Sequence, residues 1–588
     1  MIKMVKILHF FTMMWLYIGS YGHISSDLPL FVVNSFQPQG IVMNHLVINQ
    51  SMGYVYVAAR NRLYQLDMSL NTVLANVTTG PKNDSINCLP YQLQTCGDSQ
   101  ITNNTNKLLL IDTSGSRLIV CGSIYQGVCH TRSLTNISNV LWEMDMQSQN
   151  DYVSVVCNNE KGSTVGVITQ GPTVNNNVLY VATTIPNHQR RSIENPISTR
   201  SLQLSDCENK LFRYAIEQGV EGSHVKFPDN YQHEYKYAFA TGDENGFVYF
   251  VSTVQIQKNG IWSKASRIAR VCKSDIMYFS YVELPVSCGE GHQAILGARY
   301  EPNQDDTDGI LYLLFATKQG SALCYFTKSH LDEIFYDTVE ICYKYKGYNG
   351  TKEIVNLLEL PRPNECQKDD GGIYLFKPGA SLTDLIVRPK RVDLDYCPSY
   401  VVPKRQVLCG AYYLPSNMVR LVTSNATLVY KEHNVEFTAV TTNINHNNTK
   451  VAFIGTKQGA ILQVNINTST KYSTINVGQE ILPDFIWDTD PTLKVPHLYV
   501  TAKHSIFRIR AAACERFGTC GDCTQAMDPY CGWCILESRC STKKECATAL
   551  YDNTRWLGPD TQQCIYATQP TPRERTLNAD IVTSVRGC

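Results

Sequence analysis

A strand-turn-strand pattern that recurs along most of the chain is the feature that most restricts its fold. Each copy joins two apolar stretches rich in Val, Ile, Tyr and Phe through a turn with Gly, Asn or a charged residue. The copies begin at residues 53, 117, 177, 237, 309, 450 and 497. The early copies lie about 60 residues apart, a spacing that suits four-stranded blades with long loops. The pattern therefore predicts an all-β fold, a seven-bladed β-propeller.

Two features qualify this interpretation. Any all-β chain has hairpins at intervals, so an array of β-sandwiches is the alternative, and the regular recurrence favours the propeller. A gap of about 140 residues between the fifth and sixth copies must hold an insertion. The stretch SHLDEIFYDTVEICYKY, residues 329–345, is the best candidate for a helix in this region.

The N-terminus has the composition of a secretory signal. Lys3 and Lys6 precede an apolar run over residues 7–18, and small residues follow at 20–22. We expect a cleaved signal peptide over residues 1–22. A membrane anchor is the alternative, but the run is short for a bilayer span. No later stretch has the 18 or more apolar residues that a membrane helix needs, so we expect no membrane span in this chain.

Charge and glycosylation motifs are typical of an exported protein. The 52 basic and 52 acidic side chains balance, so no global field would attract nucleic acid. Behind a signal peptide, exposed N-x-S/T sequons should accept N-glycans. The candidate sites are Asn49, Asn76, Asn83, Asn103, Asn136, Asn349, Asn425, Asn447 and Asn467.

Cysteines are frequent, with 22 in the chain, and the secretory route is oxidising, so disulfides are expected. Eight of them fall between residues 514 and 564, including the pairs CGDC and CGWC. A redox couple or a zinc site is disfavoured, because Cys523 and Cys531 are too close for zinc ligand pairs and no His lies among them. Four disulfides could replace a core in so short a module, although eight cysteines allow 105 pairings.

Two regions resemble known extracellular domains. The run CERFGTCGDCTQAMDPYCGWCILESRCSTKKEC, with Trp556 and Cys564 beyond it, is similar to the PSI module of plexins, semaphorins and integrins. The stretches HLVINQSMGYVYVAARNRLYQLD, TGPKNDSINC and VAFIGTKQG, and the passage from ILPDF to LYVTAKHSIFRI, resemble the sema domain of a plexin. The resemblance implies a sema propeller over residues 23–513, a PSI module over 514–565, and a tail or the start of a further module over 566–588.

The resemblance also implies a disulfide pattern. In the PSI module it pairs Cys514 with Cys531, Cys520 with Cys564, Cys523 with Cys540 and Cys534 with Cys546, and it makes Trp533 the hydrophobic centre. In the propeller it suggests Cys88 with Cys96, Cys121 with Cys129, Cys272 with Cys409, Cys288 with Cys342 and Cys366 with Cys397. The pairing of Cys157, Cys207, Cys324 and Cys588 is left open. Cys324 lies in an expected strand, and we interpret it as a buried thiol.

Sema propellers also occur in semaphorins and in Met-type receptors. Semaphorin PSI modules typically read CAWD where this chain reads CGWC, so Cys534 favours a receptor. Met-type receptors usually carry a furin site inside the propeller. The basic run NHQRRS, residues 187–192, lacks the Arg four positions before cleavage that such a site prefers. A plexin is the better match.

The sequence carries no motif of an enzyme. It lacks the G-x-S-x-G elbow, the H-E-x-x-H zinc motif and the phosphate-binding loop. The stretch QDDTDG, residues 304–309, has Gln and Phe where a calcium loop needs its first and twelfth ligands. We therefore expect a binding scaffold with no catalytic residue, no metal and no cofactor.

The resemblance implies a function. We expect the ligand-binding end of a plexin-like receptor in cell guidance, either a fragment or a secreted short form, placed outside the cell. Its partner would be the sema domain of a semaphorin, with a co-receptor left open. The alternatives are a secreted semaphorin-like ligand that binds a plexin and a Met-type ectodomain. For contact residues we select Arg190, Arg191 and Arg200, in the basic loop of residues 185–202. A solvated blade-edge loop is the alternative there.

Overall fold

The computed structural model describes most of the chain between residues 28 and 587. It describes residues 28–356, 418–567 and 585–587 except 148–152, 172–175, 186–194, 204–210, 216–223, 226–233, 244–245, 259–260, 276–277, 279, 290–293, 303–307, 346–347, 350, 353, 446, 560 and 562–563. The expected signal peptide lies outside the described residues.

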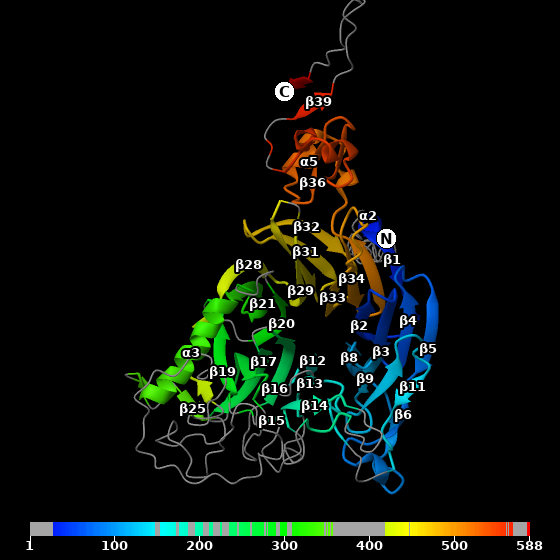
Figure 1. Ribbon diagram of the computed structural model, residues 1–588, viewed down its shortest axis with the longest axis vertical. Helices are drawn as coiled ribbons and strands as arrows, with labels where there is room; N and C mark the ends of the chain where they lie inside the picture. Colours follow the sequence, from blue (N-terminus) through cyan, green and yellow to red (C-terminus); the bar gives the residue numbers. More distant parts are fainter. Residues whose placement is uncertain are drawn as a thin grey trace, which may run out of the picture.

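Seven antiparallel blades surround a central axis, and Figure 1 looks along it. The first three blades are β2 (Met43–Asn49), β3 (Tyr54–Ala59), β4 (Arg62–Asp67) and β5 (Val73–Thr78); β8 (Asn106–Asp112), β9 (Arg117–Gly122), β10 (Cys129–Ser133) and β11 (Val140–Trp142); and β12 (Thr164–Gln170), β13 (Asn177–Thr183), β14 (Ile197–Ser201) and β15 (His224–Val225).

Blades 4 to 7 follow around the ring. They are β16 (Glu234–Gly242), β17 (Phe247–Lys258), β18 (Ile261–Cys272) and β19 (Val282–Ser287); β20 (Ala294–Glu301), β21 (Ile310–Thr317), β22 (Gly320–Thr327) and β28 (Thr427–His433); β29 (Phe437–Ile444), β30 (Lys450–Thr456), β31 (Ala460–Asn465) and β32 (Thr470–Asn476); and β33 (Ile481–Trp487), β34 (His497–Ala502), β35 (Ser505–Arg510) and β1 (Val32–Phe36). Each of the seven repeated hairpins of the sequence falls in a different blade, so the propeller prediction is confirmed.

The ring is closed at both its inner and outer edges. The first strands of consecutive blades contact one another in order from β2 to β33, and β33 contacts β2 again. At the outer edge the N-terminal strand β1 pairs with β35 of the last blade, with Val32 opposite Ile509. A short helix, α2 (Leu28–Phe31), precedes β1. The last blade is therefore built from both ends of the propeller sequence.

The middle strands are buried on both faces, and alternation of side chains explains how one strand serves two neighbouring blades. In β21, Leu311, Leu313 and Phe315 pack in a cluster with residues of blade 4. Tyr312 and Leu314 point to the opposite face and pack with residues of blade 6. A strand covered on both faces reads as a continuous apolar run, as ILYLLFAT does.

The insertion leaves blade 5 between its third and fourth strands. It begins with helix α3 (Lys328–Tyr345), which confirms the helix expected from the sequence. The strands β23 (Tyr348–Asn349) and β24 (Thr351–Lys352) form a hairpin. The strands β25 (Ile354–Asn356), β26 (Met418–Arg420) and β27 (Ser424–Asn425) extend the outer edge of blade 4, where β26 and β27 run parallel to β19.

A buried arginine anchors α3 to the propeller. The guanidinium of Arg270 lies 4.2 Å from the ring centroid of Phe247 and 4.1 Å from that of Phe335 on α3. Its Nη1 atom is 2.8 Å from Oδ1 of Asp332, which is also on α3. Lys328 forms a second ion pair with Asp332, at 2.7 Å. Charge and aromatic contacts thus fix the start of the insertion against blade 4.

A cysteine-rich module follows the propeller and lies at the top of Figure 1. Its elements are η5 (Cys514–Arg516), α5 (Cys520–Gln525), β36 (Cys531–Cys534), β37 (Arg539–Thr542), η6 (Ala547–Leu550), η7 (Asn553–Arg555) and β38 (Trp556–Leu557), followed by the pair β39 (Ile565–Ala567) and β40 (Val585–Gly587). Thr519 caps α5 by accepting a 3.1 Å hydrogen bond from the backbone N–H of Asp522.

Disulfides crosslink both the propeller and the cysteine-rich module. The four pairs in the cysteine-rich module are those that the resemblance implied: Cys514–Cys531, Cys520–Cys564, Cys523–Cys540 and Cys534–Cys546. In the propeller, Cys88–Cys96 and Cys121–Cys129 also form as expected. Cys272 is disulfide-bonded, and its expected partner Cys409 lies outside the described residues, as do Cys366, Cys397, Cys207 and Cys588.

One expected pair is wrong. Cys288 bonds to Cys324 and not to Cys342, so Cys324 is not the buried thiol that its strand position suggested. Cys288 directly follows β19 of blade 4, and Cys324 lies within β22 of blade 5. Their Cα atoms are 6.3 Å apart, within the normal reach of a disulfide. Both residues are buried where the two blades meet, a contact that spacing along the chain does not reveal.

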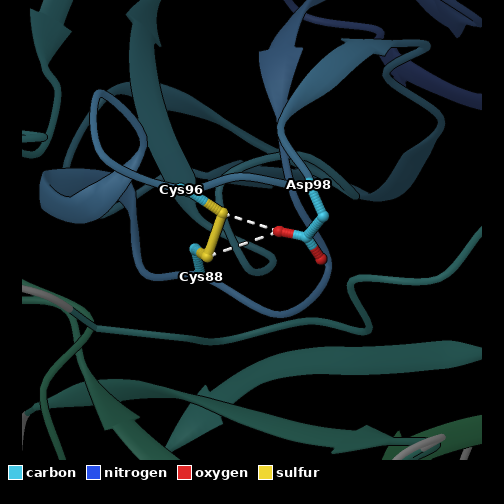
Figure 2. A group of neighbouring side chains, drawn as sticks. All are labelled: Cys88, Cys96 and Asp98. Atoms are coloured by element: carbon cyan, nitrogen blue, oxygen red, sulfur yellow. Dashed lines mark hydrogen bonds between the residues drawn. A yellow bond between two sulfur atoms is a disulfide. The ribbon is translucent and has the colours of Figure 1, made fainter.

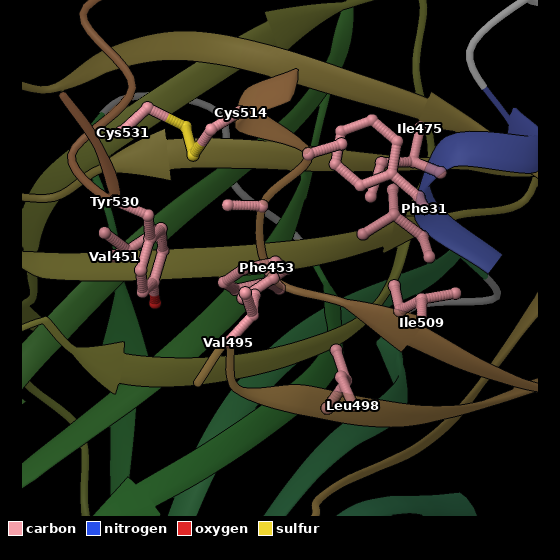
Figure 3. Packing of buried hydrophobic residues seen from close by; sticks show 14 of the residues in the cluster. Phe31, Val451, Phe453, Ile475, Val495, Leu498, Ile509, Cys514, Tyr530 and Cys531 are labelled. Atoms are coloured by element: carbon pink, nitrogen blue, oxygen red, sulfur yellow. A yellow bond between two sulfur atoms is a disulfide. The ribbon is translucent and has the colours of Figure 1, made fainter. Parts of the chain in front are cut away.

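The cysteine-rich module is packed onto the propeller and does not depend on disulfides alone. Cys514, Tyr530 and Cys531 belong to the same apolar cluster as Val451 and Phe453 of blade 6 (Figure 3). Trp533, the expected centre of the module, is buried in this shared cluster. A smaller cluster of Cys534, Cys546, Ala549 and Trp556 lies within the module itself.

Candidate ligand-binding surface

The basic loop selected from the sequence connects β13 to β14 in blade 3. Arg190 and Arg191 lie outside the described residues. The two ends of the loop are anchored, since Ile185 is buried before it and Ile197 is buried after it at the start of β14. The loop therefore leaves and re-enters a rigid sheet, as a ligand-contacting loop on a scaffold does.

The third predicted contact residue, Arg200, is not a surface group, and that prediction is wrong. Its side chain is only 5 % exposed. The guanidinium lies 4.1 Å from the ring centroid of Tyr214, and Nε donates a 2.8 Å hydrogen bond to the hydroxyl of Ser198. Arg200 pairs with Leu179 in β13, so the strand register turns its side chain into the protein. It is a scaffold residue beneath the loop.

The sequons divide the propeller into two sectors. Seven of the nine asparagines are exposed in the structure: Asn76, Asn83, Asn103, Asn136, Asn425, Asn447 and Asn467. Asn49 is half-buried, and the side chain of Asn349 lies outside the described residues. Between residues 137 and 348 the sequence has no sequon at all. This interval covers blade 3, the four main strands of blade 4 and the first three strands of blade 5, whereas Asn425 in β27 lies on the outer edge of blade 4.

Blade 4 adds a long hairpin to this part of the propeller. Strands β17 and β18 are twelve residues long each and pair along their whole length, up to Lys258 opposite Ile261. On one side β19 pairs with β18 only from Ser266 to Arg270, whereas on the other side β16 follows β17 out to Gln255. The hairpin therefore extends beyond β19.

Two groups of side chains in the described residues have the proximity of metal ligands, but neither is a metal site. One consists of Cys88, Cys96 and Asp98, where Oδ1 of Asp98 is 2.7 Å from Sγ of Cys96 (Figure 2). The other contains the bridged pair Cys534–Cys546 beside Glu537. A disulfide sulfur has no thiolate charge to offer a cation. Both groups are therefore structural.

Comparisons with known proteins agree with this architecture. The Sema domain model matches residues 293–483, and the PSI (plexin repeat) model matches residues 513–573. The chain is 28 % identical to Plexin-B2 of Mus musculus over 553 residues, covering 91 % of this chain and 27 % of the relative. It is also 28 % identical to Plexin-A4 of Danio rerio over 569 residues, covering 89 % of this chain and 27 % of the relative.

The chain is similar to the plexin family in sequence and in its Sema and PSI domains. It spans about a quarter of the length of the curated plexins that it matches. Among solved structures it is similar to the extracellular region of Plexin A4, with a TM-score of 0.73 and 24 % identity over 91 % of this chain and 52 % of that one. A complex of Drosophila Plexin A with Semaphorin 1b contains a similar fold, with a TM-score of 0.50 and 14 % identity over 87 % of this chain and 93 % of that one.

Sema and PSI domains of plexins are binding modules, and this chain carries a Sema match followed by a PSI match. No helix among its described residues is both long and apolar enough to cross a bilayer. Sequence reasoning missed two features of the site. The burial of Arg200 follows from its place between Ser198 and Tyr214, and the long hairpin of blade 4 could have been inferred from the unusually long alternation around residues 247–272.

Proposed function

We propose that this chain is the semaphorin-binding part of a plexin-type receptor. The observation that carries the proposal is the plexin arrangement of a sema propeller and a PSI module, together with the absence of sequons from the strands and loops of blade 3. The solved complex of Plexin A with Semaphorin 1b supports the choice of partner. An interface of ordinary size would bury about 1,600 Å² in total.

The mechanism we propose is recognition by loops on a rigid ring. Blade 3 holds both ends of the basic loop, and Arg200 stabilises the sheet below it. Arg190 and Arg191 would attract acidic groups of the semaphorin and raise the rate of association. A dimeric semaphorin would bring two receptors together. Glycans on the other blades would keep those faces out of the interface.

The domain boundaries belong to the same proposal. We propose cleavage of a signal peptide after residue 22, a propeller over 23–513, a PSI module over 514–565 and an extracellular location. N-terminal sequencing of the secreted protein would test the cleavage site. Full-length transcript sequencing would distinguish a short secreted form from a piece of a longer receptor.

A glycan wedge tests the interface. The substitution Gln189→Thr places a threonine two positions after Asn187 and so creates a sequon within the basic loop. A glycan there should abolish capture by an immobilised semaphorin ectodomain. The matched control, Val73→Thr, creates a sequon at Asn71 on the outer edge of blade 1 and should leave capture unchanged. Equal capture of both occupied glycoforms would refute the proposed contact region.

Charge reversal gives a second test. The pair Arg190→Glu and Arg191→Glu should slow association more at low salt than at high salt. The control pair Lys457→Glu and Lys503→Glu makes the same charge change on exposed residues of blades 6 and 7. Retention of the wild-type chain by a plexin ectodomain and not by any semaphorin would favour the alternative, a semaphorin-like ligand.

A further inference from the structure

A pocket lies where blades 1 and 2 meet, on other blades than the proposed semaphorin contact of blade 3. Its cavity volume is about 90 Å³, and its mouth is open to solvent. Beside it a short hairpin of β6 (Lys82–Asp84) and β7 (Gln100–Thr102) leaves the propeller. Nε2 of Gln126 donates a 2.8 Å hydrogen bond to the carbonyl of Cys88 and so ties the segment that connects β6 to β7 to blade 2.

Three cationic side chains, Arg62, Lys82 and Arg132, line the pocket together with one carboxylate, Glu143. Their closest partners are neutral. Nη1 of Arg62 is 2.6 Å from the hydroxyl oxygen of Thr78, and Nζ of Lys82 lies 5.7 Å from the ring centroid of Tyr125. None of the three cations forms an ion pair with a described residue.

Arg132 is the most informative of the three, because it is buried. Nη1 donates a 2.7 Å hydrogen bond to the carbonyl of Ile137, and Nε donates a 3.0 Å hydrogen bond to Nε2 of His130. These two bonds leave three of its five N–H donors for other acceptors. Burial lowers the pKa of Arg132, which Glu143 partly offsets. A buried guanidinium without a carboxylate in contact is costly.

Some other buried cations of this protein contact a carboxylate within 3.3 Å, as in Arg117–Asp112, Lys328–Asp243 and Arg508–Asp488. Others are held by neutral groups, as buried Lys107 is by two backbone carbonyls. The blade 1–2 pocket is thus one of the places where a buried cation has no carboxylate in contact. Its positive field is also felt by His130, whose pKa falls to about 3 through burial and the charges of Arg132 and Lys82. The imidazole stays neutral and does not cancel or add to the charge of the pocket.

Two unpartnered oxygens complete the lining. The amide oxygens Oδ1 of Asn104 and Oδ1 of Asn106 are buried and accept no hydrogen bond from the described residues. Both residues line the pocket. A buried acceptor without a donor costs free energy, which a ligand hydroxyl would recover. The pocket thus offers cations for an acidic group, acceptors for hydroxyls and the ring of Tyr125 as an apolar surface.

We propose that this pocket binds an acidic saccharide, a sugar residue that carries a carboxylate or a sulfate. Arg62, Lys82 and Arg132 bind the acid group, and Asn104 and Asn106 accept hydrogen bonds from its hydroxyls. Two sources can present this chemistry. A glycosaminoglycan chain can enter from solution. Alternatively, an acidic N-glycan of the protein itself can fold in, since Asn83 and Asn103 directly adjoin Lys82 and Asn104 in the sequence.

The test is titration calorimetry of the secreted chain with a heparin-derived tetrasaccharide, before and after enzymatic trimming of its N-glycans. Binding of the tetrasaccharide before trimming indicates that the pocket takes a glycosaminoglycan from solution. Binding only after trimming assigns it to the protein's own glycan. In either case, the double variant Arg62→Gln, Lys82→Gln should bind the tetrasaccharide at least about tenfold more weakly than the wild type.

Matched control variants distinguish binding in the pocket from binding that depends only on the net charge of the protein. Lys457→Gln with Lys503→Gln removes the same charge elsewhere and should leave the affinity unchanged. Absence of binding to both glycoforms, or equal affinity of the pocket variant and the wild type, would overturn the proposal. Capture by semaphorin should survive the pocket substitutions, so the two proposals fail independently.

Discussion

Cys288 and Cys324 join blade 4 to blade 5 through a disulfide, with their Cα atoms 6.3 Å apart. The bond connects the end of the outer strand of one blade to the third strand of the next, so it crosses the seam between two sheets. The seam also carries the start of the insertion, because α3 follows β22 directly. This bridge therefore ties together the region from which the insertion departs before the chain returns to blade 5 at β28.

The disulfide between blades 4 and 5 should make a measurable contribution to the stability of the protein. Replacing both Cys288 and Cys324 by Ala opens a loop of 36 residues and should lower the free energy of unfolding by about 2–4 kcal/mol. Thermal unfolding of the secreted variant measures the loss. Peptide mapping without reduction should recover Cys288 bonded to Cys324, and recovery of a Cys288–Cys342 peptide would contradict the pairing.

Arg270 should hold the insertion helix in place. Arg270→Met keeps the stem between Phe247 and Phe335 but removes the guanidinium from Asp332, which keeps Lys328 as its other partner, so we expect a cost of about 1.5–3 kcal/mol. Hydrogen exchange should accelerate in α3 more than in blade 1. Lys457→Met removes an exposed ion pair with Glu436 and should change stability by less than about 1 kcal/mol.

Gly532 should tolerate no side chain. A Cβ atom there would lie 2.3 Å from ring atoms of Trp556 and 2.4 Å from the carbonyl oxygen of Leu557, so backbone would have to move. We expect Gly532→Ala to destabilise the module by at least about 1–3 kcal/mol and to reduce secretion. Gly521→Ala is the control, since its Cβ would meet nothing closer than 3.9 Å within helix α5. Equal yields of the two variants would argue against the packing described.

The contact between module and propeller should depend on pH through Asp528. This carboxyl group is fully buried, and burial raises its pKa to about 6. Nη2 of Arg516 lies 3.7 Å from its Oδ2 atom, and the N–H of Tyr530 donates a 3.0 Å hydrogen bond to Oδ1. The unfolded group titrates near 4, so the folded state binds the extra proton between about pH 4 and pH 6.

The sign of this effect follows from the proton balance. Stability contributed by Asp528 falls as the pH rises through that window, with a slope of at most about 1.4 kcal/mol per pH unit, and levels off above pH 6. The contribution of Asp528 is the difference in the free energy of unfolding between the wild type and Asp528→Asn, measured by denaturant unfolding across this pH range. Asp490→Asn is the control, because the hydroxyl of Thr492 lowers the pKa of Asp490 and its pH dependence has the opposite sign. A flat difference curve for Asp528→Asn would contradict the prediction.

Periodicity and motif spacing in the sequence were sufficient to predict the architecture. The runs around Leu311, Tyr312 and Leu313 are apolar at every position, and this is how a strand between two blades must read. Seven such hairpins required seven sheets, and a helix was expected where α3 lies. The pairing of Cys531 with Cys514 came from family resemblance, since eight cysteines leave the pairing open.

The sequence by itself determined the strands and the repeat and indicated disulfide chemistry, because these depend on side-chain alternation and on neighbours in the chain. Only the tertiary structure decided that Cys324 meets Cys288, that Arg200 is buried and that Tyr530 packs against blade 6. Each of these contacts joins residues from different strands or sheets. Their proximity depends on the register of strands and the stacking of blades around the axis, which spacing along the chain does not encode.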